Sequence, residues 1–140
     1  MYKNILIPVA LDHIELIPDK IALARRLLAE GGRITVVTVL EGIPGYVSEF
    51  VTVKSENHLT ESVRRKLADA VGGAPDVGTE ILTGKAGVEI TQYARDTGVD
   101  LIVIGSHRPG IQDYFLGSTA ARVVRRAGCT VMVVRPDGAA

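Results

Sequence analysis

The sequence predicts an α/β fold in which an open, mostly parallel sheet is covered by helices on both faces. Strand-like and helix-like segments alternate from one end of the chain to the other. The strand-like segments include near-continuous apolar runs, such as DLIVI and TVMVV, which are typical of strands buried on both faces. The chain has 140 residues, 46% of them hydrophobic and 23% charged, so we expect residues 1–140 to form a single domain.

The first half of the chain predicts two strands and two helices. Residues 4–10 (NILIPVA) form the first strand, and residues 33–40 (RITVVTVL), rich in β-branched side chains, form the second. The helix between these strands has Pro18 in its first turn and the glycine pair 31–32 as its stop. A second helix ends at another glycine pair. The apolar positions of the two helices are Ile17, Ile21, Ala24 and Leu28 in the first and Leu59, Val63, Leu67 and Ala70 in the second.

The second half predicts three more strands and two more helices. The strands are residues 77–83, 100–104 and 130–134. The third helix ends near Gly98, and Gly128 terminates the fourth. The apolar faces of these helices are formed by Ile90, Tyr93, Ala94 and Thr97, and by Ala120, Val123, Val124 and Ala127. The whole chain therefore predicts five strands and four helices.

Composition excludes several classes of function. Sixteen basic side chains balance sixteen acidic ones, so we expect no binding to nucleic acid or to an anionic membrane surface. Cys129 is the only cysteine, which rules out an intrachain disulfide and a cysteine zinc cluster. No apolar run approaches the roughly 20 residues of a membrane span, and the N-terminus enters a strand-like pattern directly. We therefore expect a cytoplasmic protein without membrane insertion.

Residues 101–122 (LIVIGSHRPGIQDYFLGSTAAR) carry the main functional signal. A helix N-terminus leaves backbone N–H groups unpaired and carries partial positive charge. Glycines let the backbone approach an anion closely, and hydroxyl groups and an arginine supply side-chain donors. The segment therefore predicts a phosphate site. The alternative is an ordinary strand-to-helix connection with Ser118 as its N-cap. The candidate contacts end the strand, line the loop and open the helix: Gly105, Ser106, His107, Arg108, Gly117, Ser118 and Thr119.

The topology of such a sheet places a ligand in the same region. Right-handed crossovers leave chiefly the strand orders 2-1-3-4-5 and 3-2-1-4-5, and periodicity does not choose between them. Either order predicts a ligand outside the carboxyl ends of the strands, where the strand order reverses. In the second order, residues 8–12 and 105–118 flank that crevice.

Four segments together resemble the universal stress protein (UspA-like) family: KNILIPV, VDLIVIGSHRPG, LGSTAARVVRRA and CTVMVVR. They occur in family order and spacing over essentially the whole chain. The resemblance implies a Rossmann-like fold, similar to the adenine nucleotide alpha hydrolases, with strand order 3-2-1-4-5, and usually a homodimer. It also implies ATP binding through the pattern G-x2-G-x9-G-[ST]. Gly105 matches its first glycine, and Gly117 and Ser118 match its closing pair.

The chain departs from the family pattern at two places. Arg108 stands at the second glycine position, and the interval to Gly117 is one residue shorter than in the pattern. This S-H-R-P version resembles a branch of small family members that bind nucleotide. The first strand of the family commonly ends Pro-x-Asp, whereas this chain has Pro8-Val9-Ala10. Asp12 is then the carboxylate available to a ribose or to Mg²⁺, and the metal requirement stays open.

The resemblance also implies where the rest of a nucleotide would lie. Pro8, Val9 and Ala10 would border an apolar slot for adenine, and the backbone of Val39 would contact the base. Gly84, after the third strand, would leave room for the ribose or the base. The alternative is that these are plain core and strand-end positions, which the periodicity explains equally well.

The expected function is that of an ATP-binding, dimeric stress-response or regulatory module, with AMP and ADP as further candidate ligands. We expect no catalytic constellation, since His13, His58 and His107 lack metal-ligand spacing and the chain has neither G-x-S-x-G nor a P-loop. One alternative is an enzyme that hydrolyses ATP slowly or phosphorylates itself on Ser118 or Thr119. Another is a family member that binds a client protein without nucleotide.

The last strand predicts a partner. In the implied strand order, Thr130–Val134 lies at an edge of the sheet, and an uncovered edge invites pairing with another chain. Two copies that pair through this strand would form a closed two-fold dimer.

Overall fold

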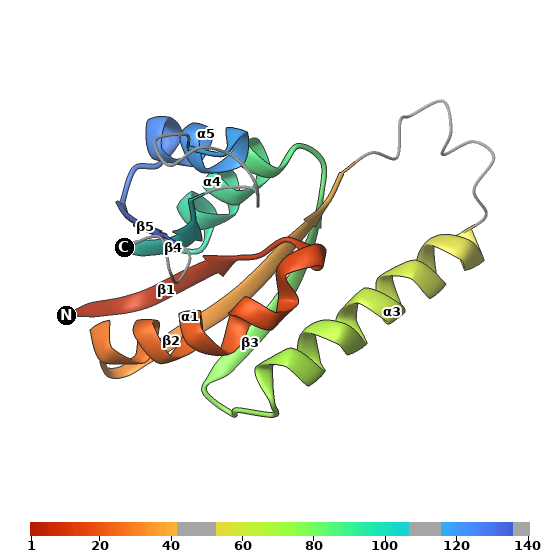
Figure 1. Cartoon of the computed structure of the whole chain (residues 1–140), viewed down its shortest axis with the longest axis horizontal. Helices are drawn as coiled ribbons and strands as arrows, with labels where there is room; N and C mark the ends of the chain where they lie inside the picture. The colour runs from red at the N-terminus through yellow and green to blue at the C-terminus, as the bar shows by residue number, and fades with distance from the viewer. Residues whose placement is uncertain (42–52, 107–115, 136–140) are drawn as a thin grey trace.

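Figure 1 shows the computed structural model, which describes residues 1–41, 53–106 and 116–135, with the backbone alone for residues 53–59. The sheet has the order β3-β2-β1-β4-β5, and every neighbouring pair is parallel. This confirms the α/β fold and the order 3-2-1-4-5. The elements in chain order are β1 (Tyr2–Pro8), the 3₁₀ helix η1 (Leu11–Leu16), α1 (Ile17–Leu27), β2 (Leu28–Leu40), α3 (Val53–Val71), β3 (Val77–Thr83), α4 (Ala86–Asp96), β4 (Leu101–Gly105), α5 (Ser118–Arg126) and β5 (Thr130–Val134).

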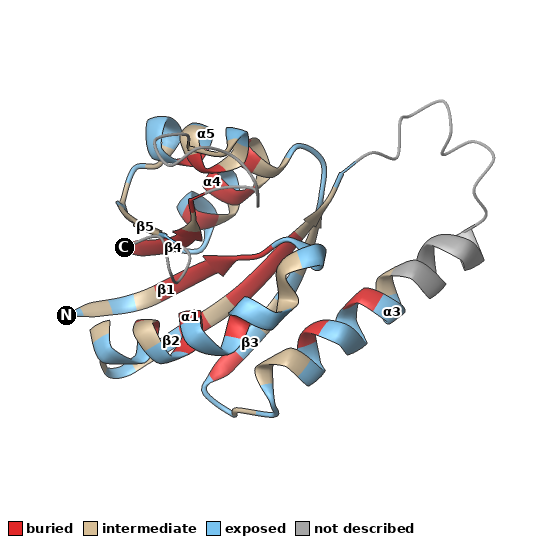
Figure 2. Ribbon diagram, in the orientation of Figure 1, coloured by how far each residue is buried: buried red, intermediate tan, exposed pale blue. Residues whose placement is uncertain are grey.

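Helices cover both faces of the sheet, α1 and α3 on one side and α4 and α5 on the other (Figure 1). Each face of the sheet has its own hydrophobic core, and the alternating side chains of β1 contribute to both. Ile5 and Ile7 pack on the side of α1 and α3, and Leu6 packs on the side of α4 and α5. Figure 2 shows that burial is concentrated in β1, in β4 and in the middle of β2. Strands buried on both faces explain the continuous apolar runs of the sequence.

The beginning of β2 differs from the sequence prediction. The glycine pair 31–32 was expected to stop the first helix, but α1 ends at Leu27, and Leu28 is already extended. Leu28 pairs with Tyr2, and the register then shifts so that Arg33 pairs with Asn4. The glycines therefore lie in an irregular start of β2, where Gly31 has φ +78°. Pairing with β1 ends the helix earlier than its apolar periodicity indicated.

The end of β1 also differs. The strand was expected to run through Ala10, but it ends at Pro8 and keeps one further backbone bond, from the Val9 N–H to the Val37 carbonyl (2.8 Å). The Ala10 carbonyl instead accepts a bond from the His13 N–H (3.0 Å), which starts η1. This turn carries the chain from the centre of the sheet to α1.

None of the helices in the described ranges is long and apolar enough to cross a membrane.

Candidate functional site

A cavity of about 600 Å³ lies at the carboxyl ends of four neighbouring strands. Its floor follows the sheet order from Val39 in β2, through Val9 after β1 and Gly105 in β4, to Val134 in β5. η1 and α1 wall it on one side, and the start of α5 on the other. It therefore lies where the strand order reverses, as the topology predicts for a ligand.

The cavity brings together most of the site residues predicted from the sequence. Gly84 lies outside the lining, and its N–H donates to the Leu40 carbonyl (3.2 Å). His107 and Arg108 lie outside the described residues. The predicted residues that line the cavity are Pro8, Val9, Ala10, Asp12, Val39, Gly105, Ser106, Gly117, Ser118 and Thr119.

The start of α5 leaves its first backbone donors without a side-chain cap. Gly117, rather than Ser118, is the N-cap residue, and no side chain caps this end of the helix. The Gly117 carbonyl accepts from the Ala121 N–H (2.9 Å), so the N–H groups of Ser118, Thr119 and Ala120 precede the first helical bond. These three residues line the cavity. The helix N-terminus therefore supplies donors and partial positive charge to this wall.

Ser106 fixes the position of that helix start. Its N–H donates to the Val134 carbonyl (3.0 Å), and its carbonyl accepts from the Gly117 N–H (2.7 Å). Ser106 lines the cavity and is 2% exposed, yet no described residue hydrogen-bonds to its hydroxyl. Ser106 thus ties β4 to β5 and to α5 and leaves one hydroxyl group for a ligand.

The opposite end of the cavity is apolar and offers backbone groups from β2. Successive residues of β2 turn their backbone groups to opposite neighbours: the Val37 carbonyl bonds toward β1 and the Leu40 carbonyl toward β3. Val39 therefore faces β1, but pairing with β1 has already ended opposite Val37. The backbone groups of Val39 are thus directed past the end of β1, into the cavity that Val39 lines.

Both backbone groups of Val9 are already used by the fold. Its N–H donates to Val37, and its carbonyl accepts from the buried Thr38 hydroxyl (2.9 Å). Val9 therefore offers a ligand its apolar side chain, while Val39 offers a donor and an acceptor. Both line this end of the cavity, and apolar side chains beside free backbone groups suit a flat, partly apolar ligand group.

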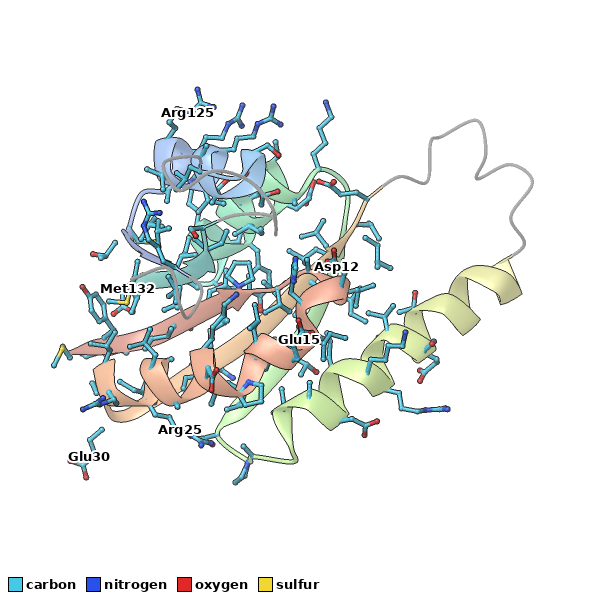
Figure 3. The ribbon with its side chains drawn as sticks, in the orientation of Figure 1. Asp12, Glu15, Arg25, Glu30, Arg125 and Met132 are labelled. Atoms are coloured by element: carbon cyan, nitrogen blue, oxygen red, sulfur yellow. The ribbon has the colours of Figure 1, made fainter. Side chains whose placement is uncertain are left out.

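Acidic side chains gather at the η1 end of the cavity, as Figure 3 shows for Asp12 and Glu15. Asp12 and Glu15 flank His13 at 3.8 and 3.9 Å, and the Asp12 side chain is 81% exposed. Glu41 accepts a hydrogen bond from the Ala86 N–H and thereby holds the start of α4. Within the described ranges, no group of three His, Cys, Asp or Glu side chains is arranged to hold a metal ion.

Among the lining residues that the sequence prediction missed, Lys20 is the buried basic one. It is 8% exposed, and burial lowers the pKa of its ammonium group. A signal for it exists in the sequence, because Lys20 stands three residues after Ile17 and four before Ala24, on the buried stripe of α1. The periodicity was counted over apolar residues alone, so a lysine on that stripe was passed over.

The chain is similar to proteins of one family. The family profile described as "Universal stress protein family" matches residues 1–135. Universal stress protein G of Escherichia coli O157:H7 is 30% identical over 96% of this chain and 100% of its own length. Universal stress protein MJ0577 of Methanocaldococcus jannaschii is also 30% identical, over 96% of both chains.

Solved structures support the same relationship. The structure of MJ0577 aligns with a TM-score of 0.80 and 26% identity over 99% of both chains. More distant structures share the fold and were solved with nucleotides. A universal stress protein from Archaeoglobus fulgidus in complex with dAMP has a TM-score of 0.62 and 20% identity over 94% of this chain and 97% of its own. Another, in complex with cAMP, has a TM-score of 0.57 and 19% identity over 95% and 96%.

Proposed function

Because this chain belongs to the universal stress protein family, we propose that it is a regulatory module that binds an adenine nucleotide, with ATP as its ligand. The observation that carries the proposal is the order of chemical groups along the cavity. Val9 and Val39 line the apolar end, and the N-terminus of α5 lies at the other. A base would occupy the first and phosphates the second.

The length of the cavity suits a nucleotide. From β2 to β5 it crosses three interstrand spacings, about 14 Å in all. The dAMP and cAMP complexes of relatives with this fold support the adenine nucleotide class. ATP is our choice within that class because the lining continues beyond α5 to Val134 and Arg135 at the end of β5, which leaves room for more than one phosphate.

We expect Gly117→Val to abolish retention of nucleotide. Its backbone, with φ −58° and ψ 154°, is open to valine, so the fold should persist. The added side chain would stand on the cavity wall beside the donors of α5. Nucleotide released from the purified protein by denaturation is identified by chromatography, and binding of ATP with Mg²⁺ is measured by calorimetry. We expect affinity to fall at least about tenfold, a cost of about 1.4 kcal/mol.

The matched control is Gly128→Val, the same change just beyond the other end of α5. A Cβ atom on Gly128 meets nothing within 4 Å, and Gly128 does not line the cavity. This variant should bind as the wild type does. Wild-type protein that carries no nucleotide and gives no heat with ATP would refute the proposal. Steady ATP turnover above background, lost in Ser118→Ala, would favour the enzyme alternative.

The proposal also includes self-association and a cytoplasmic location. β5 is bonded to β4 alone, so one of its sides is a sheet edge in the described part of the chain. Pairing of two such edges would give the two-fold dimer that the resemblance implies. The single cysteine is in keeping with a reducing compartment.

A further inference from the structure

We propose that the Lys20 ammonium group is a phosphate ligand of this site and selects phosphorylated nucleotides over neutral nucleosides. This inference rests on the proposed function for the nucleoside part of the ligand, but the anion site it describes can be tested without a base. Nothing in the glycine and serine pattern of the phosphate segment points to Lys20, which comes from a different part of the chain.

The first step is the position of the ammonium group. Lys20 Nζ lies 3.1 Å, and Cε 3.8 Å, from the position that a Cβ atom would take on Gly105. Leu101 and Val103 turn their side chains to the α1 face of β4, and Gly105 continues that alternation. The ammonium group therefore lies over the last residue of β4, in the space that the missing side chain of Gly105 leaves open.

The second step is the lack of a partner for this charge. In the described part of the chain, no carboxylate forms an ion pair with Lys20 and no acceptor hydrogen-bonds to its ammonium group. Every fully enclosed side-chain nitrogen and oxygen there does have a hydrogen-bond partner. Since Nζ has none, it must be open to the cavity that Lys20 lines.

Four carboxylates and one arginine share the cavity lining with Lys20. The titratable and charged groups that line the cavity with Lys20 are Asp12, His13, Glu15, Asp19, Glu41 and Arg135. The carboxylates belong to η1, to the start of α1 and to the end of β2, and none of them pairs with Lys20. Across the cavity from α1, the first turn of α5 offers backbone N–H groups. A phosphate between α1 and α5 would accept hydrogen bonds from the Lys20 ammonium group and from these backbone N–H groups.

The third step is energetic. A lysine is rarely buried without a partner, because its charged form loses hydration. That loss lowers the pKa of Lys20 in the free protein, and a bound phosphate would raise it again by favouring the charged form. Binding should therefore take up protons where the free ammonium is partly deprotonated. Affinity should fall as the pH rises through the pKa of Lys20 in the free protein.

The test is Lys20→Met, which keeps an unbranched side chain and removes the charge. ATP, adenosine and inorganic pyrophosphate are titrated into wild type and variant by calorimetry. A charge-assisted hydrogen bond to phosphate predicts that ATP and pyrophosphate affinity falls about 10- to 100-fold, while adenosine affinity is unchanged. Lys66→Met is the matched control, because Lys66 is exposed on α3 and outside the cavity lining.

Two further readouts separate a ligand role from a structural one. The melting temperature of free Lys20→Met should rise by a few degrees, because an unpaired buried charge is removed, whereas a structural lysine would give a lower value. Proton uptake on ATP binding, measured in buffers of different ionisation enthalpy, should vanish in the variant. If Lys20→Met lowered the affinities for ATP and adenosine equally, or lowered neither, the inference would be overturned.

Gly105→Ala tests the same position with Lys20 intact. Its Cβ atom would displace the flexible end of Lys20, so the fold should persist while ATP and pyrophosphate affinity falls several-fold. Unchanged affinity in this variant would contradict the assigned position of the ammonium group. The outcomes also separate the two proposals: Lys20-dependent pyrophosphate binding without ATP binding would refute the nucleotide function alone, whereas ATP binding that ignores Lys20 would refute this inference alone.

Discussion

Among single residues, Asp100 holds the end of the sheet opposite the cavity. Its carboxylate accepts from the N–H groups of Lys3 and Asn4, both at 2.9 Å, and its own N–H donates to the Asn4 carbonyl (3.0 Å). The Asn4 amide then donates to the Thr97 carbonyl (2.8 Å). One aspartate therefore joins the starts of β1 and β4, the strands between which the cavity opens at their other ends.

Asp100→Ala should lower stability without affecting the ligand site. Partial burial raises the pKa of Asp100, but backbone N–H donors, chiefly those of Lys3 and Asn4, and the charge of Lys3 together outweigh it, so the net result is a lowered pKa. Because the pKa of Asp100 is lower in the folded protein, its ionised carboxylate stabilises the fold at pH values above the unfolded-state pKa of about 3.9. This stabilisation is lost as the pH falls through the folded-state pKa. Denaturant unfolding should show a loss of about 1 kcal/mol at neutral pH. The difference from wild type should shrink below about pH 4.

The control for this prediction is Asp69→Ala, which removes the same group from an exposed position on α3 and should be nearly neutral. ATP affinity should be the same in both variants and the wild type. A stability difference that persists in acid would contradict the role given to the Asp100 carboxylate.

At the scale of elements, the packing of α4 on α5 positions the donors at the cavity. Gly87 is buried in the first turn of α4. A Cβ atom there would lie 2.7 Å from Arg122 Cδ and 2.8 Å from Arg122 Cβ. Since Arg122 Cβ is fixed to the α5 backbone, the two helices can approach this closely only with glycine at position 87.

Gly87→Ala should push α5 away from α4. Overpacking costs about 1–3 kcal/mol, and the better helix propensity of alanine returns at most about 1 kcal/mol, so we expect a net loss of about 1 kcal/mol. ATP affinity should fall as well, since the first turn of α5 moves. The control is Gly78→Ala in β3, where the nearest atom, Thr35 Oγ1, is 3.9 Å from the new Cβ. A Gly87→Ala protein as stable as the wild type would contradict this account of the packing.

The elements themselves could largely be predicted from the sequence, and their exceptions have physical reasons. The run 77–83 appears as β3 with the bounds predicted from the sequence, because one strand and its flanking turns are local features. The start of β2 could not be predicted, since Leu28 leaves α1 to pair with Tyr2, which lies far away in the sequence. Tertiary pairing decided that boundary.

At the scale of the whole molecule, the candidate site likewise has parts that could be predicted from local sequence and parts that depend on tertiary contacts. The start of α5 could be predicted because a glycine before Ser118 and Thr119 is a local helix signal. The sequence places Lys20 on the buried stripe of α1, but its place in the site could not be predicted, since that depends on α1 crossing the end of β4 on one face of the sheet. The roles of His107 and Arg108 remain predictions outside the described residues. Site residues that are close together in the sequence can therefore be predicted from it, whereas contacts between distant elements are known only once the fold is known.

The side of β5 that pairs with no other strand in the described part of the chain is the remaining large-scale feature, and Met132 lies on this strand near the margin of the molecule (Figure 3). The Val134 carbonyl accepts a hydrogen bond from the N–H of Ser106, just after β4, so the backbone groups of Val134 face β4. Those of the neighbouring Val133 then point the other way, to the edge of the described sheet. A dimer formed by pairing of two β5 strands would therefore use the Val133 N–H, which the protein's own sheet does not need.

Val133→Pro should accordingly separate the dimer while preserving the fold. Proline removes the outward N–H and is tolerated at sheet edges, so the fold should persist, with a stability loss of about 1–2 kcal/mol because the Val133 side chain packs against the α4 and α5 core. Sedimentation should show the mass of two chains for wild type and of one chain for the variant. Val133→Ala, which trims the side chain but keeps the N–H, should remain dimeric. A dimeric Val133→Pro protein would show that the two copies meet elsewhere, because edge pairing requires this donor.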